Sequence, residues 1–173
     1  PILDLFCISS GFILRAIAGG LVSESIPSFW FLLTISLLSF FVAVNKRKAE
    51  LLRSKKTGII YKKVLKFYSL KVLVVIENLS SAFAFISYSL WASGPILKGA
   101  STQWMLLTAP IVFYIIYRYK LSSNPKVAKS INGINSEFIH ERPEELFLKD
   151  LKLKYSFLIW LLSAFSIFAL TRT

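Results

Sequence analysis

Residues 45–66 read NKRKAELLRSKKTGIIYKKVLK and separate two long apolar stretches of the chain. Nine of the 21 Lys and Arg residues of the protein lie in this segment, against one acid, Glu50. Cytoplasmic loops of multi-spanning membrane proteins are enriched in Lys and Arg whatever their function. Clustered cations at a membrane surface are also what a protein needs to hold phosphate or diphosphate groups. The segment therefore predicts a cytoplasmic loop of a membrane protein and leaves open whether that loop binds anions.

The overall composition also indicates a membrane protein. Hydrophobic residues make up 55% of the sequence and aromatic residues 15%, and the mean hydropathy is +0.61. Soluble domains contain roughly 45–50% apolar residues even with glycine counted, so this chain is too apolar for that class. The net charge of +12 lies largely in two segments without a nucleic-acid-binding motif, so a membrane and not nucleic acid is the expected partner. One cysteine and one histidine exclude a disulfide framework and a Cys/His metal cluster made within this chain.

The apolar stretches predict an all-α integral membrane protein, with five transmembrane helices in a single domain over residues 1–173. A helix needs about 20 apolar residues to cross the roughly 30 Å hydrocarbon core. The fourth stretch is short and contains Pro110, which predicts a kink in that helix. The predicted spans are 4–22, 29–45, 67–91, 104–119 and 155–170.

The distribution of Lys and Arg predicts the orientation of these spans. Residues 118–154 add eight basic residues and five acids, whereas the connections after the first and third spans contain one charge each. By the positive-inside rule, the loops 46–66 and 120–154 face the cytoplasm of a multi-pass protein of the inner (cell) membrane. Pro1 then lies inside and Thr173 outside. Because the chain begins at Pro1 without a signal peptide, we expect it to be part of a longer polypeptide.

Charged side chains inside predicted spans need an explanation of their own. Arg15 lies well inside the first span, and Gly11, Ala18 and Gly19 share its helical face, where another helix can pack closely. An ionised side chain at that depth is rare unless it faces a protein interior or a water-filled cavity. We predict that Arg15 faces a central cavity and helps to bind an anion; snorkelling or a structural ion pair is the alternative. Glu77, in the third span, must be paired, protonated or functional.

Three charged residues at the start of the basic segment are the candidates for chemistry. Lys46 and Glu50 are four residues apart, so they share a face if the segment begins as a helix, with Arg47 beside them. Lys46 and Arg47 are predicted to grip substrate phosphates, and Glu50 to orient them. The alternative is a salt-bridged helix end that serves only as a topology signal.

Several strings of the sequence match a known family. They are DLF at 4–6, GFILRAIAGG at 11–20, SFWFLL at 28–33 and KRKAEL at 46–51, followed by Tyr68, the pair Arg118-Tyr119, PEEL at 143–146 and Asp150. In these strings the chain resembles decaprenyl-phosphate phosphoribosyltransferases, members of the UbiA superfamily of intramembrane prenyltransferases. The second and fourth strings are fairly specific together, and the resemblance covers nearly the whole chain. It implies that the five spans are the second half of a nine-helix bundle around a cavity that opens to the cytoplasm.

The resemblance implies a membrane-embedded enzyme of cell-envelope polysaccharide precursor synthesis. Such an enzyme transfers 5-phosphoribose from phosphoribosyl pyrophosphate to a polyprenyl (decaprenyl) phosphate and releases diphosphate. Mg²⁺ is the implied cofactor, bound by an Asp-rich motif expected upstream, so this chain alone is expected to be inactive. The implied substrate-binding residues are Lys46, Arg47, Glu50, Arg15, Tyr68 and Arg118.

Two alternatives remain open at the level of sequence. A UbiA-type aromatic prenyltransferase of quinone, haem or chlorophyll synthesis shares the fold, but such relatives carry Asp residues where this chain has KRKAE at 46–50. The exchange of acids for cations favours a substrate with an additional phosphate. A transporter or channel module is the alternative of a different class, supported by Arg15 and Glu77 within spans.

Overall fold

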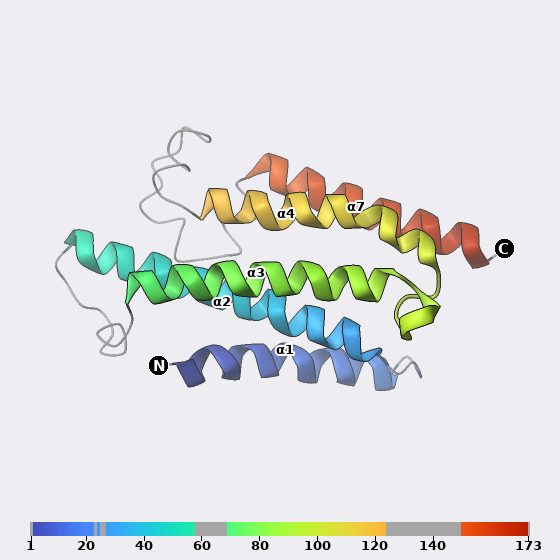
Figure 1. The fold of residues 1–173 in the computed structure, drawn as a ribbon, viewed down its shortest axis with the longest axis horizontal. Coiled ribbons are helices and arrows are strands. Elements are labelled where there is room, and N and C mark those ends of the chain that lie inside the picture. The colour runs from blue at the N-terminus through green and yellow to red at the C-terminus, as the bar shows by residue number, and fades with distance from the viewer. Residues whose placement is uncertain (1, 23, 25–26, 58–68, 124–149, 173) are drawn as a thin grey trace.

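The described part of the chain is entirely helical in its regular structure. A computed structural model describes residues 2–22, 24, 27–57, 69–123 and 150–172. Its elements are α1 (Ile2–Val22), α2 (Phe29–Thr57), α3 (Leu70–Ala92), the 3-10 helices η2 (Pro95–Leu97) and η3 (Gln103–Thr108), α4 (Ala109–Ser122) and α7 (Leu151–Arg172) (Figure 1).

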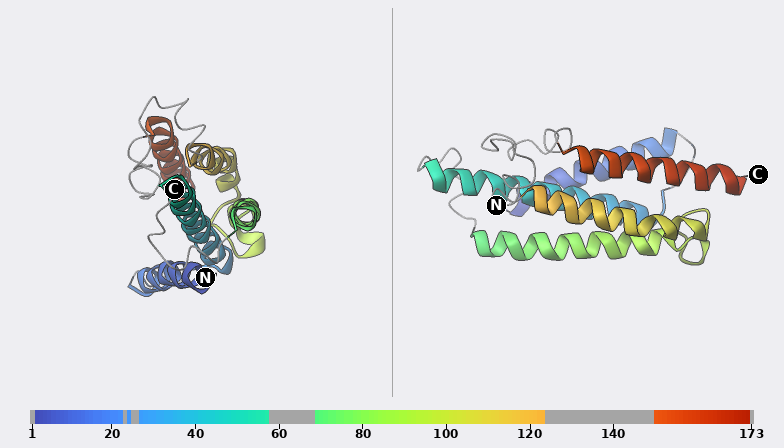
Figure 2. Two further views of the ribbon diagram at one scale, coloured as in Figure 1. Left: turned by 90° about the vertical axis from the view of Figure 1, so that its left-hand side faces the viewer. Right: turned by 90° about the horizontal axis from the view of Figure 1, so that it is seen from above.

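The α-helices lie side by side along one long axis. α1 forms one edge of the bundle and α4 with α7 the other, while α2 and α3 lie between them (Figures 1 and 2). α1 packs on α2, α2 on α3, α3 on α4, and α4 on α7. The two ends of the chain lie at opposite ends of the bundle (Figure 1), as five successive crossings require.

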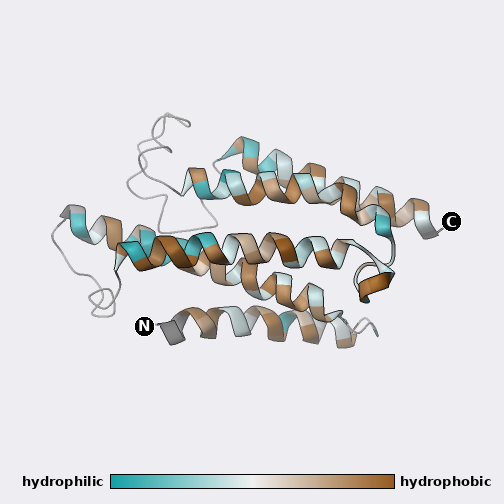
Figure 3. Cartoon of the chain, viewed as in Figure 1, coloured by the Kyte–Doolittle hydropathy of each residue, from teal (hydrophilic) through white to brown (hydrophobic). Residues whose placement is uncertain are grey.

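The helices confirm an all-α, multi-pass membrane protein. Four of them are long and apolar enough to cross a membrane, with candidate spans at Leu5–Val22, Phe29–Leu52, Leu70–Ala92 and Leu151–Thr171. Apolar residues occupy much of their length, and hydrophilic residues gather toward the helix ends (Figure 3). Large apolar side chains are exposed on the outer helices, including Phe165 and Leu170 at 71% and 77% exposure, as expected of a surface that faces lipid.

The fourth predicted span differs from the expectation of one kinked helix. Residues 103–108 form η3, and the 14-residue α4 begins at Ala109 with Pro110 in its first turn. Proline has no backbone N–H, which the first turn of a helix does not use, so Pro110 marks the start of an α-helix and not a kink within one. At 14 residues, α4 is shorter than the roughly 20 that a span needs, and η3 supplies the rest of the length.

The start of the predicted 46–66 loop is helical. α2 continues through Lys46 to Thr57, so twelve residues assigned to the loop extend the second helix beyond its predicted end at 45. This part of the sequence is rich in Lys, Arg, Glu, Leu and Ala, which are good helix formers, and Ala49 and Leu51 remain buried there. Charge marks where a helix leaves the hydrocarbon core, but it does not end the helix. The remainder, 58–66, and residues 124–149 of the second predicted loop lie outside the described residues.

Two clusters of buried apolar residues hold the bundle together. One joins α1, α2 and α3 through Leu5, Ala43, Val44, Leu51 and Leu73. The other joins α2, α3, α4 and α7 through Phe41, Tyr88, Ala92, Ala109, Val112, Ile116, Tyr119 and Leu153. Hydrogen bonds reinforce the second cluster. The Tyr88 hydroxyl hydrogen-bonds Thr108, and the Trp160 indole N–H donates to the Tyr88 hydroxyl at 2.8 Å.

The connection from α3 to α4 folds tightly around two glycines. Gly94 has φ of +88°, a conformation that favours glycine. Gly99 lies against α3, where the backbone N–H of the next residue, Ala100, donates to the Trp91 carbonyl at 2.8 Å. A Cβ at position 99 would lie 2.2 Å from that carbonyl oxygen, so the turn has no room for a side chain.

We expect Gly99→Ala to destabilise the protein, because backbone must move to admit the methyl group. Overpacking of this kind costs about 1–3 kcal/mol, and more where backbone is the obstacle. Ser101→Ala, at an exposed position in the same connection, is the matched control and should change the free energy of unfolding by less than about 0.5 kcal/mol. Thermal unfolding in detergent measures both, and equal stability of the two variants would contradict the tight turn.

Candidate functional site

Charged and polar side chains tie successive helices together at one end of the bundle. This end contains the last turns of α2, the first turns of α3, the end of α4 and the start of α7 (Figure 1). Lys48 of α2 pairs with Glu77 of α3, Lys120 of α4 hydrogen-bonds Asn78 of α3, and Arg118 of α4 pairs with Asp150 before α7. We call this end of the bundle the basic end.

Arg47 and Glu50 form an ion pair on the surface of α2. Arg47 Nη1 donates to Glu50 Oε2 at 2.6 Å, one helical turn away, and the two side chains are only 13% and 11% exposed. Lys46 precedes them on the same helix and is partly exposed. Of the two cations predicted from KRKAE, Arg47 pairs with Glu50, and Lys46 lies one residue before Arg47 on the same helix. Their role in binding substrate stays a prediction.

Lys48, which sequence reasoning had not singled out, has a different role from its two neighbours. Its Nζ donates to Glu77 Oε2 across the α2–α3 interface, and the side chains are 10% and 1% exposed. Glu77 is therefore paired, one of the three outcomes expected for a carboxylate in a span. The two partners are 29 positions apart in the sequence, so the pair could not be recognised there, because only the antiparallel packing of α2 and α3 brings them together.

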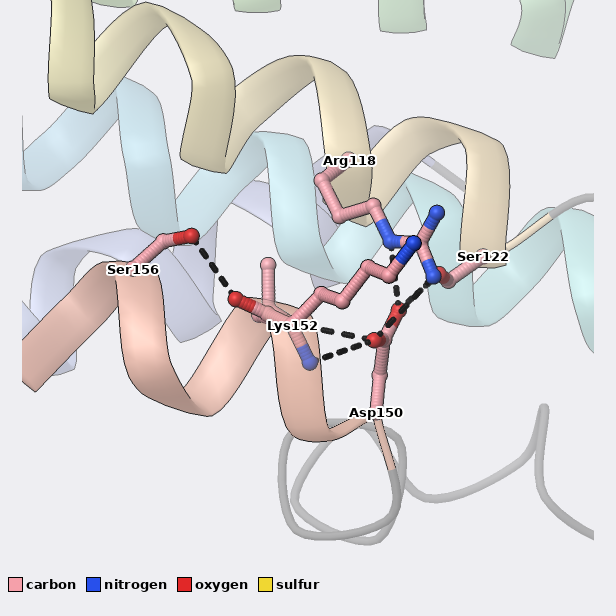
Figure 4. Close-up of polar contacts among 6 residues, drawn as sticks. Arg118, Ser122, Asp150, Lys152 and Ser156 are labelled. Atoms are coloured by element: carbon pink, nitrogen blue, oxygen red, sulfur yellow. Dashed lines mark hydrogen bonds and ion pairs between the residues drawn. The ribbon is translucent and has the colours of Figure 1, made fainter. Parts of the chain in front are cut away.

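Arg118 of α4 and Asp150, which directly precedes α7, form a bidentate ion pair (Figure 4). Arg118 Nε donates to Asp150 Oδ2 at 2.9 Å and Arg118 Nη2 to Oδ1 at 3.2 Å. Ser122 also donates to Asp150, and the backbone N–H groups of Lys152 and Leu153 donate to Oδ1 at 3.1 and 3.3 Å, so Asp150 caps the first turn of α7. Arg118, predicted to bind substrate, is thus 7% exposed and engaged with a carboxylate.

The environment of Asp150 favours its ionised form. Burial raises the pKa of this carboxyl, but hydrogen bonds from Ser122, Arg118 and the Leu153 amide, together with the charge of Arg118, outweigh burial and hold the pKa below its ordinary value of 3.8. Asp150 precedes the apolar stretch of α7 and lies at the basic end. The geometry therefore describes a structural ion pair that joins the end of α4 to the start of α7.

Arg15 lies far from the basic end. Leu5 of α1 packs in the same cluster as Val44 of α2, and Arg15 is ten residues further along, about 15 Å at the 1.5 Å rise of a helix. Its side chain is exposed, donates to the Gly11 carbonyl at 3.4 Å and lies 5.6 Å from the centre of the Phe12 ring. The structure does not bring Arg15 together with Lys46 and Arg47.

A cavity of about 1120 Å³ opens beside Arg15. Its walls come from α1, the start of α2, the end of α3, the connection at 97–102, η3 and α7, with Trp30 and Trp91 among the lining side chains. The cavity lies at the end of the bundle opposite the basic end, and its lining does not include Lys46 or Arg118. Arg15 therefore lines a cavity that does not contain the other candidates, and its predicted place in a central, anion-binding cavity stays a prediction.

Two predicted features are not tested by the described residues. Tyr68, implied as a substrate-binding residue, lies outside them. No group of three or more His, Cys, Asp or Glu side chains suited to a metal ion occurs in residues 2–22, 24, 27–57, 69–123 and 150–172. The described part of this chain therefore does not by itself fit a Mg²⁺ site.

Comparison with known proteins connects this architecture to a group of enzymes. Over 167 residues, 92% of the chain, the sequence is 34% identical to a decaprenyl-phosphate phosphoribosyltransferase of Mycolicibacterium smegmatis, covering 49% of that protein. A protein of the same name from Mycobacterium tuberculosis H37Rv is 29% identical over 160 residues, 92% of the chain and 48% of the relative. One from Corynebacterium glutamicum is 38% identical over 91 residues, 53% of the chain and 27% of the relative. The chain is homologous to part of the decaprenyl-phosphate phosphoribosyltransferases. No family model matches it.

The chain spans about half the length of the curated phosphoribosyltransferases that it matches most extensively. The resemblance first drawn from strings such as GFILRAIAGG and KRKAEL is thereby confirmed at the level of phosphoribosyltransferase homology. Membership of the UbiA superfamily, and the assignment to the second half of a nine-helix bundle, stay predictions.

Proposed function

We propose that the protein carrying this chain transfers 5-phosphoribose from phosphoribosyl pyrophosphate to a polyprenyl phosphate in the membrane and releases diphosphate. The observation that carries this proposal is the 34% identity to a decaprenyl-phosphate phosphoribosyltransferase across 92% of the chain. The lipid acceptor requires a protein that lies in the membrane, and the apolar helices supply one. The product would enter the synthesis of cell-envelope polysaccharide precursors.

The chemistry of this transfer places specific demands on the site. A phosphate oxygen of the lipid attacks the anomeric carbon of the donor, and the bond from that carbon to diphosphate breaks with the electron pair leaving on the diphosphate. Positive charge develops on the sugar and negative charge on the leaving group, so the enzyme needs fixed cations where the diphosphate lies. In this chain we assign that role to Lys46 and Arg47, at the point where α2 becomes hydrophilic.

The ion pair with Glu50 supports this assignment for Arg47. A guanidinium has five N–H donors in a planar fork that matches phosphate as well as carboxylate, so pairing with Glu50 and contact with a phosphate are compatible in one side chain. A partner on the same helix also restricts the side chain before the substrate arrives, which lowers the entropy cost of binding. Glu50 accordingly orients Arg47, while Lys46 contributes a more mobile point charge.

We include Mg²⁺ in the proposal because of the family resemblance, and not because of contacts in this chain. A divalent cation would neutralise charge on the diphosphate as it leaves. Because the described residues do not fit a metal site by themselves, the ligands would lie in other residues of the protein. The loops at the basic end would face the cytoplasm of a cell-membrane protein, where phosphoribosyl pyrophosphate is a soluble substrate.

A transfer assay with two donor–acceptor pairs tests the proposal. The complete polypeptide, purified in detergent with Mg²⁺, is given labelled phosphoribosyl pyrophosphate with a polyprenyl phosphate, or a polyprenyl diphosphate with an aromatic acid. We expect labelled phosphoribose to appear on the lipid in the first reaction and no product in the second. Prenylation of the aromatic acid without phosphoribosyl transfer would show an aromatic prenyltransferase and contradict the proposal. Absence of both products would contradict phosphoribosyl transfer and aromatic prenylation alike.

A further inference from the structure

The Lys48–Glu77 ion pair joins α2 to α3 directly beside the proposed phosphate-binding cations. Glu77 is seven residues into α3, within its apolar candidate span, and only 1% of its side chain is exposed. A carboxylate at that position cannot reach water, so it requires a partner within the protein. Lys48 supplies that partner from α2, one residue after Arg47 and two after Lys46.

Helix geometry couples the direction of Lys48 to the directions of Lys46 and Arg47. Successive side chains on an α-helix are about 100° apart, so three adjacent cations point to three different sides of α2. Lys48 points at α3, and Arg47 therefore turns away from it toward Glu50 on its own helix. Any rotation of α2 that broke the Lys48 contact would turn Lys46 and Arg47 by the same angle.

A second contact holds the other end of α2 against the same helix. Thr34 and Ser87 hydrogen-bond each other at 2.9 Å, and Ser87 also donates to the Trp30 carbonyl at 3.3 Å. Thr34 is 14 residues before Lys48, about 21 Å along the helix axis. At the basic end, Val44 and Leu51 of α2 pack in one cluster with Leu73 of α3, so the Lys48–Glu77 contact acts together with this apolar packing to set the rotation of α2 there.

Stability alone is a weak explanation for this pair. Glu77 Oε1 is buried and has no hydrogen-bond partner among the described residues, so the carboxylate uses one of its two oxygens. A buried acceptor without a donor is costly, and a buried ion pair is often no more stabilising than apolar side chains of similar size. In some proteins such a pair is retained because it specifies one arrangement of the segments that it joins.

Building on the function proposed above, we infer that Glu77 is a positioning residue for the cations at the basic end. Through Lys48 it fixes the rotation of α2, and so the direction in which Lys46 and Arg47 meet the diphosphate of the donor. Glu77 acts through Lys48 and does not itself contact the substrate.

Steady-state kinetics on the complete polypeptide test this inference. The variants are Glu77→Gln, Lys48→Gln and the double variant, and the measurements are KM for phosphoribosyl pyrophosphate, kcat and the fraction of folded protein. Each single variant should raise KM on the order of 10- to 100-fold, the effect of misplacing binding groups by about 1 Å, with a smaller change in kcat. The double variant carries no uncompensated buried charge and its two amides can hydrogen-bond, so its KM should return toward that of the wild type.

A matched control separates positioning from a general loosening of the bundle. Lys120→Gln weakens the neighbouring contact between α4 and Asn78 of α3 and should leave KM unchanged. An equal rise of KM in this variant would overturn the inference. So would unchanged KM in both folded single variants, or a double variant as impaired as Glu77→Gln, which would mean that Glu77 does not act through Lys48.

The remaining outcomes of these experiments contradict either the inference or the proposed function. Single variants that fail to fold, beside a double variant that turns over like the wild type, would make the pair structural only and overturn the inference. Failure of the wild type to transfer phosphoribose would remove the proposed function and the inference with it. Transfer by the wild type with normal kinetics in Glu77→Gln would remove the inference alone.

Discussion

Lys46→Ala and Arg47→Ala should each weaken binding of phosphoribosyl pyrophosphate about 10- to 150-fold in the complete enzyme, while expression and topology are kept. A charge-assisted hydrogen bond to a phosphate contributes about 1.5–3 kcal/mol, which sets this range. The larger loss is expected for Arg47→Ala, because it also removes the 2.6 Å ion pair and leaves the Glu50 carboxylate near the incoming anion. Titration of the donor, with KM from the transfer assay, measures both variants.

The controls for this prediction lie further along the same basic segment. Lys55→Ala and Lys56→Ala remove the same charge from the last turn of α2, beyond the proposed contacts. These two variants should bind the donor like the wild type, apart from a small general electrostatic effect. Equal and small effects at all four positions would show that the segment serves as a topology signal and does not form a phosphate site.

Arg118→Leu should lower the free energy of unfolding by about 3–5 kcal/mol, because it leaves the buried Asp150 without its counter-charge. Arg118→Lys keeps the charge but cannot form both contacts with the carboxylate, so its loss should be smaller. In the double variant Arg118→Leu with Asp150→Asn, the loss should be less than the sum of the two single losses, because the partners are in direct contact. Thermal or denaturant unfolding in detergent measures the free energy of unfolding of the wild type and of the four variants, which are Arg118→Leu, Arg118→Lys, Asp150→Asn and the double variant.

The pH dependence of stability gives this prediction a second readout. The folded-state pKa of Asp150 is lowered, so the stability it contributes is fully present above its unfolded value of 3.8 and is lost as the pH falls through the lower folded value. The difference in stability between wild type and Asp150→Asn should therefore narrow on acidification below pH 3.8. If Arg118 binds substrate instead, Arg118→Leu will unfold like the wild type and lose phosphoribosyl transfer, contrary to our expectation.

The sequence by itself determined the class of the protein and the places of most of its apolar helices. Runs of apolar residues long enough to cross the hydrocarbon core predicted helices that overlap α1, α2, α3 and α7, since only a helix satisfies its backbone hydrogen bonds without water. Strings such as GFILRAIAGG and KRKAEL were sufficient to indicate the phosphoribosyltransferase relatives. The sequence also marked Glu77 as a carboxylate that needed a partner.

The sequence was less informative about helix ends and could not assign partners. Lys46 was expected in a loop, but helix formers and the buried Ala49 and Leu51 carry α2 on to Thr57, because charge ends a transmembrane segment without ending its helix. Pro110 was expected to bend a helix, but it lies in a first turn, where its missing N–H is not needed.

The tertiary structure alone decided which charges meet. Lys48 and Glu77 are 29 residues apart and Arg118 and Asp150 are 32 apart, and nothing in their spacing distinguishes these partners from other Lys, Arg, Asp or Glu residues. Antiparallel packing of α2 on α3 and of α4 on α7 places them opposite each other, while it leaves Arg15 beside a cavity at the other end. The reason is physical: hydropathy along a chain records how deep a residue lies in the membrane, but the rotation and neighbours of each helix are set by packing between helices.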